Sequence, residues 1–412
     1  DGIRDIGVTG VQTCALPISG MTTRPPARRR LLSTAMGMGE IVRPCGRTRQ
    51  QRPRGWSAID GQDALDSPRT APPYFRPFRD RLPAPPRPWV HAADREEHST
   101  GMFRAAASQL TTSRWELSEE LDRFAAHGFE SVAMWRHKLS DAGAPAIRRM
   151  LARTGIRVSS LQWAGGFTGS DGRTFDESVA DAEEAIDWAA ALGAGALVLH
   201  SGCRGGHTRS HARRLLVQAI ERLAPRACRA GVALALKPLH RAAAANCSFL
   251  SRLVDALELV EHLIDRSQTN ACVGLAIDLW HFGDDPDLGP LLPLLIDRTV
   301  VVQVADRIGP PTADQERLPA GRGTLPLDEA VAAMIEFGYR GDVEFDPVGE
   351  AVESDGYDRV LAEIRATSAT WARTLEAHAP HGDCDSQPWL YRPRAGSGAR
   401  KSHASSQMVS PG

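Results

Sequence analysis

The 412-residue sequence has little lysine, no paired cysteines and no long apolar run. Lysine occurs only at Lys138, Lys237 and Lys401, so nearly all positive charge is arginine, and a lysine inside the fold needs an explanation. The seven cysteines form no C-x-x-C pair, which argues against a zinc ribbon or a disulfide framework. No stretch approaches the roughly 20 apolar residues of a membrane-spanning helix. We therefore expect a reduced, cytoplasmic protein.

The charges of the chain are balanced. Its 49 basic and 50 acidic residues leave a formal net charge of -1. This balance gives no reason to expect nucleic acid or an anionic membrane as a partner.

Both ends of the chain differ from its centre. Residues 1–20 include DGIRDIGVTGVQTCALPI, which resembles a translated sequencing-library adapter, and we expect them to lie outside the natural protein. Residues 21–101 contain 12 of the 28 prolines, and 15 arginines against 8 acidic residues. We predict a disordered extension or upstream non-native sequence, with Met102 as the natural start, and a second disordered tail over 378–412. A nucleic-acid role for the Arg-rich arm is a weaker hypothesis, because few aromatics lie among its basic residues.

Residues 102–377 alternate between short apolar runs and amphipathic segments of helical period. We predict strands at Phe103–Ser108, Ser131–Trp135, Ile156–Gln162, Ala196–His200, Val232–Lys237, Val273–Asp278, Val300–Ala305 and Asp342–Asp346. Ser118 is the expected N-cap of the first helix. Eight strands in about 275 residues predict an α/β fold, a single (β/α)8 TIM barrel. No G-x-G-x-x-G follows the first strand, which disfavours a dinucleotide-binding sheet.

Polar side chains are concentrated where the predicted strands end. In a barrel these ends form the active-site face, and buried charge there is costly unless it is paired or bound to metal. The residues are Trp135, Arg136, His137, Gln162, Trp163, His200, Lys237, His240, Asp278, His281, Gln303, Asp306, Glu344 and Asp346. We interpret them as a candidate substrate site.

Two local patterns each leave an alternative open. Asp278 ends a buried strand and His281 follows three residues later, so the pair either faces one functional cavity or consists of a capping aspartate that orients a packed histidine. Gly321-Arg322-Gly323 lies in the loop after the seventh strand and is either a phosphate cradle or a flexible turn.

Several short motifs, in order, resemble those of the xylose isomerase-like TIM-barrel superfamily of sugar phosphate isomerases and epimerases. The motifs are Trp115-Glu116-Leu117-Ser118, Gly128-Phe129-Glu130-Ser131-Val132, Leu236-Lys237-Pro238-Leu239-His240, Asp278-Leu279-Trp280-His281, Val302-Gln303-Val304-Ala305-Asp306, Pro319-Ala320-Gly321-Arg322-Gly323 and Gly338-Tyr339-Arg340-Gly341. The resemblance covers the whole predicted barrel.

The resemblance implies a divalent metal (Mn, Mg, Co or Zn) that polarises a substrate carbonyl while carboxylates move a proton on the adjacent carbon. The implied ligand positions fall on Lys237, Asp278, Gln303 and Asp346, of which only Asp278 matches the family's residue. Asp346 keeps a carboxylate and Gln303 keeps an oxygen donor. Lys237 is the departure, because an ammonium group repels a divalent cation.

Three interpretations of Lys237 are open. Its ammonium takes the place of the metal and pairs with Asp278 and Asp346; or it forms a Schiff base with substrate; or it is a sequence error, since one base separates Lys and Glu codons.

The resulting hypothesis is a sugar or sugar phosphate isomerase or epimerase that works by metal-assisted proton transfer. The alternatives are a metal-free carbohydrate-binding or degenerate barrel, and a Lys237-dependent lyase or aldolase. Candidate catalytic residues are Lys237, Asp346 and His281; candidate metal ligands are Asp278, Gln303 and Asp346; candidate substrate-binding residues are His240, His281, Trp135, His200, Arg317 and Arg322. The expected partner is a small sugar, and a homo-oligomer is expected by resemblance alone.

Overall fold

The computed structural model describes residues 103–139, 142–267 and 270–378. The expectations for residues 1–20, 21–101 and 379–412 lie outside these ranges. No helix in the described ranges combines the length and the apolar character needed to cross a bilayer.

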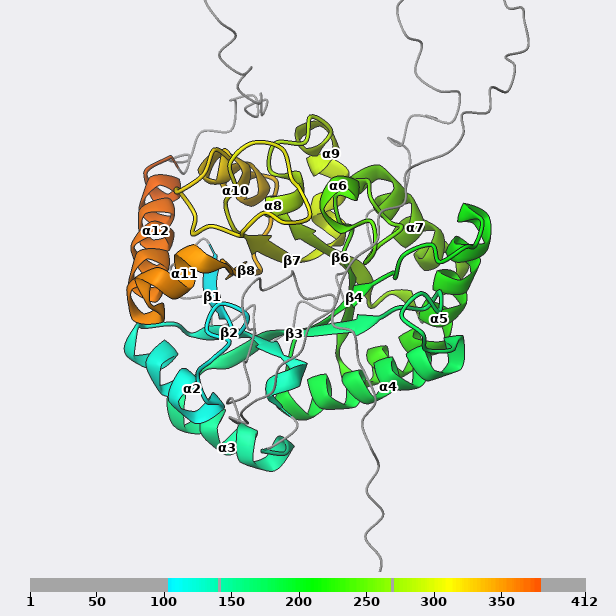
Figure 1. The fold of residues 1–412 in the computed structure, drawn as a ribbon, viewed down its shortest axis with the longest axis horizontal. Coiled ribbons are helices and arrows are strands. Elements are labelled where there is room, and N and C mark those ends of the chain that lie inside the picture. The colour runs from blue at the N-terminus through cyan, green and yellow to red at the C-terminus, as the bar shows by residue number, and fades with distance from the viewer. Residues whose placement is uncertain (1–102, 140–141, 268–269, 379–412) are drawn as a thin grey trace, which may run out of the picture. The chain divides into compact units, whose positions relative to one another are not determined.

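Eight parallel strands close into a barrel in sequence order (Figure 1). They are β1 (Arg104–Ser108), β2 (Ser131–Trp135), β3 (Arg157–Gly165), β4 (Ala196–His200), β5 (Ala233–Leu236), β6 (Val273–Asp278), β7 (Thr299–Val304) and β8 (Asp342–Phe345). Closure comes from the pairing of β1 with β8, in which Ala106 lies opposite Glu344. The predicted strand count and fold are therefore confirmed, with end shifts of a few residues, the largest at β3.

The longer helices surround the strands as an outer ring (Figure 1), and three short helices follow the carboxyl ends of β5, β6 and β8. The helices are α2 (Leu117–Ala126), α3 (Ala144–Thr154), α4 (Phe175–Leu192), α5 (Arg209–Ala230), α6 (Arg241–Ala244), α7 (Leu253–Arg266), α8 (Leu279–Phe282), α9 (Leu288–Leu295), α10 (Leu327–Glu336), α11 (Glu350–Asp355) and α12 (Tyr357–His378), with 3-10 turns at Arg136–Lys138 and Ile296–Arg298. The expected N-cap at Ser118 is wrong, because α2 begins at Leu117 and its N-cap is Glu116, two residues earlier, without a side-chain cap bond.

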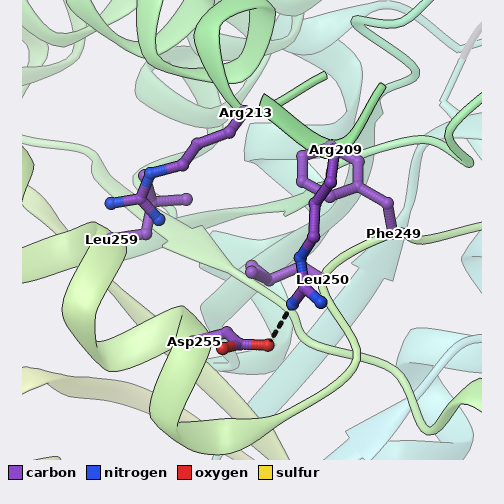
Figure 2. Close-up of a pocket in the computed structure, with 6 residues that line it drawn as sticks. All are labelled: Arg209, Arg213, Phe249, Leu250, Asp255 and Leu259. Atoms are coloured by element: carbon purple, nitrogen blue, oxygen red, sulfur yellow. Dashed lines mark hydrogen bonds and ion pairs between the residues drawn. The ribbon is translucent and has the colours of Figure 1, made fainter. Parts of the chain in front are cut away.

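A small cavity of about 100 Å³ lies in the helical layer (Figure 2). It is lined by α5, by α7 and by the segment that precedes α7, and the ion pair between Arg209 and Asp255 lies beside it. No strand residue lines this cavity, so it is separate from the strand ends where the sequence places the candidate site.

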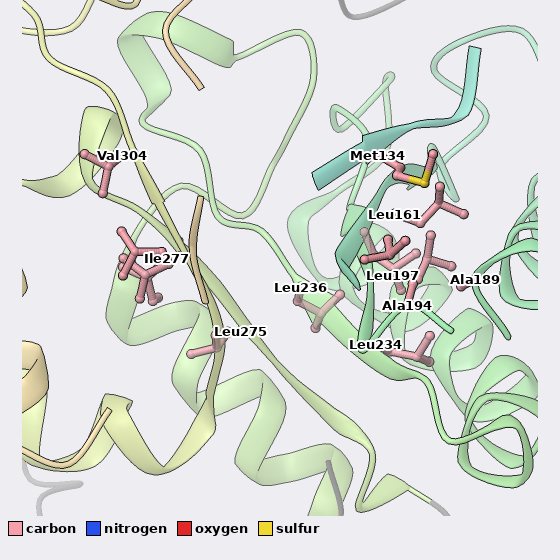
Figure 3. Close-up of a cluster of buried hydrophobic side chains, with 14 of the residues drawn as sticks. Met134, Leu161, Ala189, Ala194, Leu197, Leu234, Leu236, Leu275, Ile277 and Val304 are labelled. Atoms are coloured by element: carbon pink, nitrogen blue, oxygen red, sulfur yellow. The ribbon is translucent and has the colours of Figure 1, made fainter. Parts of the chain in front are cut away.

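The strands bury alternate side chains against two different surroundings. Outward-facing residues such as Leu197, Leu234 and Leu275 join the large apolar core beneath the helices (Figure 3). Burying each such leucine stabilises the fold by about 1.5–3 kcal/mol. The intervening residues form a second cluster inside the barrel, made of Ala196, Val198, Ala233, Ala235, Ala276 and Val301.

The same alternation places the polar residues. Side chains two residues apart in a strand lie on the same face of the sheet. Two positions beyond Val198, Ala235 and Ala276, the inner face therefore carries His200, Lys237 and Asp278, and Gln303 follows Val301 in the same way. A layer of small apolar side chains thus supports a layer of polar ones at the carboxyl ends of the strands.

Candidate functional site

Two cations and two carboxylates form a buried network at the ends of β5, β6 and β8. Lys237 Nζ lies 2.7 Å from Asp278 Oδ2, and the two side chains are 9% and 0% exposed. Arg317 contacts both oxygens of Asp278 at 3.1 Å and Asp346 Oδ1 at 2.5 Å. The four formal charges sum to zero, so the network is neutral without any additional ion.

Arg317 reaches this network from the long segment between β7 and α10. Its backbone pairs with Val348 after β8, its Nε donates to the Asp346 carbonyl at 3.1 Å, and its guanidinium lies 5.4 Å from the ring centre of Trp280. The Trp280 indole N–H in turn donates to the Glu316 carbonyl at 3.1 Å. The guanidinium is therefore held by backbone pairing and by stacking as well as by charge.

The network separates the protonation behaviour of its two carboxyls. Burial alone would raise the pKa of Asp278, but Arg317 and then Lys237 hold it well below its usual range. Burial raises the pKa of Asp346 to about 6, although Arg317 acts to lower it. Both carboxyls are thus mainly ionised at neutral pH, and Asp346 is the one that accepts a proton more readily.

Asp278 also positions His281. Its Oδ1 accepts a hydrogen bond from the Trp280 backbone N–H at 2.9 Å and caps α8. His281 Nδ1 accepts from the His240 backbone N–H at 3.3 Å, while its Nε2 lies 3.9 Å from Asp278 Oδ2. Burial lowers the pKa of His281, so its ring is neutral, with Nε2 carrying the proton.

A second polar cluster is centred on Glu344 of β8. Glu344 Oε2 accepts from the side-chain amides of Gln162 and Gln303 at 2.9 Å each, and Oε1 accepts from Ser159 at 2.6 Å. Burial raises the pKa of Glu344 to about 7. Gln303 Oε1 is buried and has no hydrogen-bond partner within the described residues.

His200 and Trp135 present further unsatisfied polar atoms. Both ring nitrogens of His200 and the Trp135 indole nitrogen are buried without a hydrogen-bond partner in the described part of the chain. The His200 ring stacks on Trp163, with ring centres 5.2 Å apart, and burial lowers its pKa to about 3. A buried polar atom without a partner is costly, so these atoms suit water or a polar ligand.

The residues at the implied metal positions do not fit a divalent cation. Lys237 and Arg317 contact the Asp278 and Asp346 carboxylates that would have to bind it. Gln303 supplies the remaining oxygen, a neutral amide. Across 103–139, 142–267 and 270–378 there is no group of three or more His, Cys, Asp or Glu side chains placed to hold a metal.

The glycine-containing loop after β7 is organised from within. Asp306 Oδ2 accepts from the backbone N–H groups of Gly321 and Gly323 at 3.0 and 2.9 Å. Arg322 pairs with Glu363, at 2.7 Å from Nε, and with Asp355. The amides that a phosphate cradle would use are therefore bound to Asp306, and Arg322 points to α11 and α12.

The structure thus brings together part of the predicted site. Lys237, Asp278, His281, Asp346 and Arg317 form one connected cluster. Gln303 pairs in register with Asp278 on one side and with Glu344 on the other, and the charges of Lys237 and Asp278 act on His200.

The remaining candidates occupy other positions. His240 caps α6, its Nδ1 accepting from the Ala242 N–H at 3.3 Å, and Trp135 is anchored at its backbone N–H by Gln109 at 2.8 Å. The sequence analysis did not predict that Gln162 and Glu344 form hydrogen bonds in this site. A signal for Glu344 was present, because it lies two residues before Asp346 and therefore on the same strand face.

Comparisons with known proteins agree with this architecture. A sequence model described as "Xylose isomerase-like TIM barrel" matches residues 121–367. A protein of Sinorhizobium meliloti 1021 has a similar structure, with TM-score 0.56 and 26% identity over 66% of this chain and 98% of its own. No curated protein sequence matches the chain.

Two more distant structures share the fold. An IOLI protein with a bound zinc atom has TM-score 0.57 and 16% identity over 66% of this chain and 99% of its own. D-psicose 3-epimerase from Clostridium cellulolyticum H10, solved with D-tagatose, has TM-score 0.52 and 14% identity over the same shares. The match of the sequence model to more than half of the chain shows that this protein belongs to the xylose isomerase-like TIM-barrel family.

Proposed function

We propose that the protein is a metal-independent isomerase or epimerase that binds a small sugar-like carbonyl compound at the strand ends and transfers a proton on the carbon next to the carbonyl. The observation that carries this proposal is the contact of Lys237 and Arg317 with Asp278 and Asp346, which builds positive charge into the position that the family resemblance gives to a metal.

The proposed chemistry needs a base near the carbon and a positive charge near the carbonyl oxygen. Asp346, with its pKa raised to about 6 by burial, is the base. The proton moves from carbon to Asp346, and the electron pair moves to the carbonyl oxygen, where Lys237 and Arg317 stabilise the enediolate. Return of that proton to the neighbouring carbon gives the isomer, as the hydroxyl proton passes from the neighbouring oxygen to the former carbonyl oxygen. The epimer needs a second proton donor on the opposite face of the same carbon, and we assign that role to the Lys237 ammonium.

The polyhydroxylated character of the substrate is supported by the unsatisfied polar atoms. Gln303 Oε1 and one His200 ring nitrogen are acceptors, and the other His200 ring nitrogen and the Trp135 indole N–H are donors that hydroxyl groups can pair with. The Trp163–His200 stack provides a flat apolar surface for the carbon face of such a molecule. His281 and His240 complete the proposed substrate contacts.

Solvent exchange tests the proposal without knowledge of the product. The chelator-treated protein is incubated in D₂O with D-tagatose, D-fructose and their 6-phosphates, and ¹H NMR follows the proton on the carbon next to the carbonyl. We expect exchange without added metal, no acceleration by Mn, Mg, Co or Zn, and loss by about 100-fold or more in Asp346→Asn. Asp187→Asn, which alters an exposed carboxylate paired with Arg226, is the matched control. Exchange that appears only after metal is added would contradict the proposal.

A non-catalytic sugar-binding barrel is the second candidate. It is favoured by the full pairing of the four network charges, which leaves neither cation free of a carboxylate. Calorimetric binding of a sugar without deuterium exchange would support it. Borohydride trapping of substrate on Lys237 would instead support a lysine-dependent lyase or aldolase, in which Lys237 would first have to leave its ion pair with Asp278.

A further inference from the structure

We infer that the strand-end site selects an unphosphorylated, hydroxyl-bearing ligand, and that Glu344 sets this selectivity by turning the Gln303 side-chain carbonyl toward the ligand. The inference rests on the proposed function for the class of ligand, and it adds the ligand's charge and the residue that determines it.

The orientation of Gln303 follows from its partner. Glu344 Oε2 accepts hydrogen bonds from the side-chain amide nitrogens of Gln303 and Gln162, each at 2.9 Å. Ser159 donates to the other oxygen at 2.6 Å, which fixes the carboxylate between three donors. Gln303 must then present its oxygen, and that oxygen is buried without a partner among the described residues.

An unpartnered carbonyl oxygen is satisfied by a group that donates a hydrogen bond, from water or from a ligand. A sugar hydroxyl donates a hydrogen bond, whereas a phosphate dianion offers only acceptor oxygens. Gln303 also lies in register between Asp278 and Glu344, so an anion placed there would face two carboxylates. Both effects favour a neutral hydroxyl over a phosphate at this position.

The buried cations nearby already have partners. Lys237 and Arg317 are paired with Asp278 and Asp346, and Arg322 with Glu363 and Asp355. The Gly321 and Gly323 amides, which could have bound a phosphate, donate to Asp306. A phosphate would therefore have to break an existing ion pair or hydrogen bond at each of these groups.

Titration calorimetry on the full chain tests the inference with D-tagatose and D-tagatose 6-phosphate as probes. We expect the unaltered protein to bind the unphosphorylated sugar at least about tenfold more tightly. In Glu344→Gln, the new amide can donate to Gln303, which lets the Gln303 side chain turn its N–H groups outward. The preference should then fall to about threefold or less. The ratio of the two affinities does not depend on how much of a variant is folded.

Gln303→Met is the second variant, because it removes the acceptor and leaves Glu344 in place. It should reduce the same preference, whereas the exposed-surface control Asp187→Asn should keep it. The inference would be overturned if the unaltered protein bound D-tagatose 6-phosphate more tightly than D-tagatose and lost this preference when the exposed Arg204 and Arg241 are replaced by Ala. The proposed function would still stand in that case. An unchanged preference in both site variants would also overturn it. Binding of neither sugar, a distinct result, would overturn the proposed function together with the inference.

Discussion

Arg317 neutralises two buried carboxylates at once, and its loss should be costly. Replacing it by Met keeps the apolar stem and leaves Asp278 and Asp346 facing each other with Lys237 as the remaining cation. Removing one member of a buried charge network typically costs about 3–5 kcal/mol. We expect Arg317→Met to lower the free energy of unfolding in urea by about this amount.

Arg226 offers the matched comparison. It pairs with Asp187 through a similar guanidinium contact, but both side chains are about half exposed. Arg226→Met should change the free energy of unfolding little, because exposed ion pairs are screened by water. Similar losses in the two variants would contradict the view that the Arg317 network is buried and essential to the fold.

His200 predicts a pH dependence of stability. Its pKa falls from 6.5 to about 3 in the folded chain, chiefly through burial. The unfolded chain therefore takes up a proton below pH 6.5 that the folded chain refuses, and stability is lost as the pH falls from 6.5 toward 3. Between pH 7.5 and 5, His200 should contribute a loss of about 2 kcal/mol. In urea unfolding, His200→Gln should lose about 2 kcal/mol less free energy of unfolding than the unaltered protein between pH 7.5 and 5. The same pH dependence in both proteins would refute this role of His200.

Which single residues matter was partly predictable from the sequence. The scarcity of lysine made Lys237 conspicuous, and an ion pair with Asp278 and Asp346 was one of the three interpretations of it. The partners of Arg317 could not be predicted, because 39 and 29 residues separate it from Asp278 and Asp346. The parallel pairing of β6 with β7 and of β7 with β8 brings these distant segments together.

At the scale of an element, Asp306 holds the loop between β7 and α10. Its carboxylate accepts from the Gly321 and Gly323 amides, and a methyl group added to Gly323 would lie 2.3 Å from Asp306 Oδ1. In Asp306→Asn, one side-chain oxygen becomes a nitrogen that cannot accept. We expect a loss of about 1–3 kcal/mol and faster hydrogen exchange at both glycine amides.

Asp328→Asn, at an exposed position in the first turn of α10, is the control for this loop. Its effect on the exchange of Gly321 and Gly323 should be small. Unchanged exchange in Asp306→Asn would show that the loop is held by other contacts.

The elements themselves were well predicted because the barrel strands are short apolar runs between helices. β2, β4 and β6 begin and end as expected, since a polar or aromatic residue closes each run. The N-cap of α2 was not, because Glu116 takes that position without a side-chain bond and so leaves no capping signature. The geometry of the site depends on contacts between strands, which the periodicity of one strand does not contain.

At the scale of the whole molecule, the closed barrel should fold without the flanking sequence. All eight strands lie within residues 104–345, and the family match covers 121–367. We expect residues 102–377 expressed alone to show one cooperative thermal transition with the midpoint of the full chain. A midpoint more than about 5 °C lower would mean that the flanking residues contribute to the fold.

The most direct test of the built-in cations is metal binding by the full, chelator-treated chain. Calorimetry and thermal unfolding with Mn, Mg, Co and Zn would be compared with the variant Lys237→Glu/Arg317→Met, in which both cations are replaced and a carboxylate is added. We predict no stoichiometric binding and no shift of the midpoint for the unaltered chain, and a gain of metal binding in the variant. One tightly bound equivalent of metal that raises the midpoint of the unaltered chain would contradict the account.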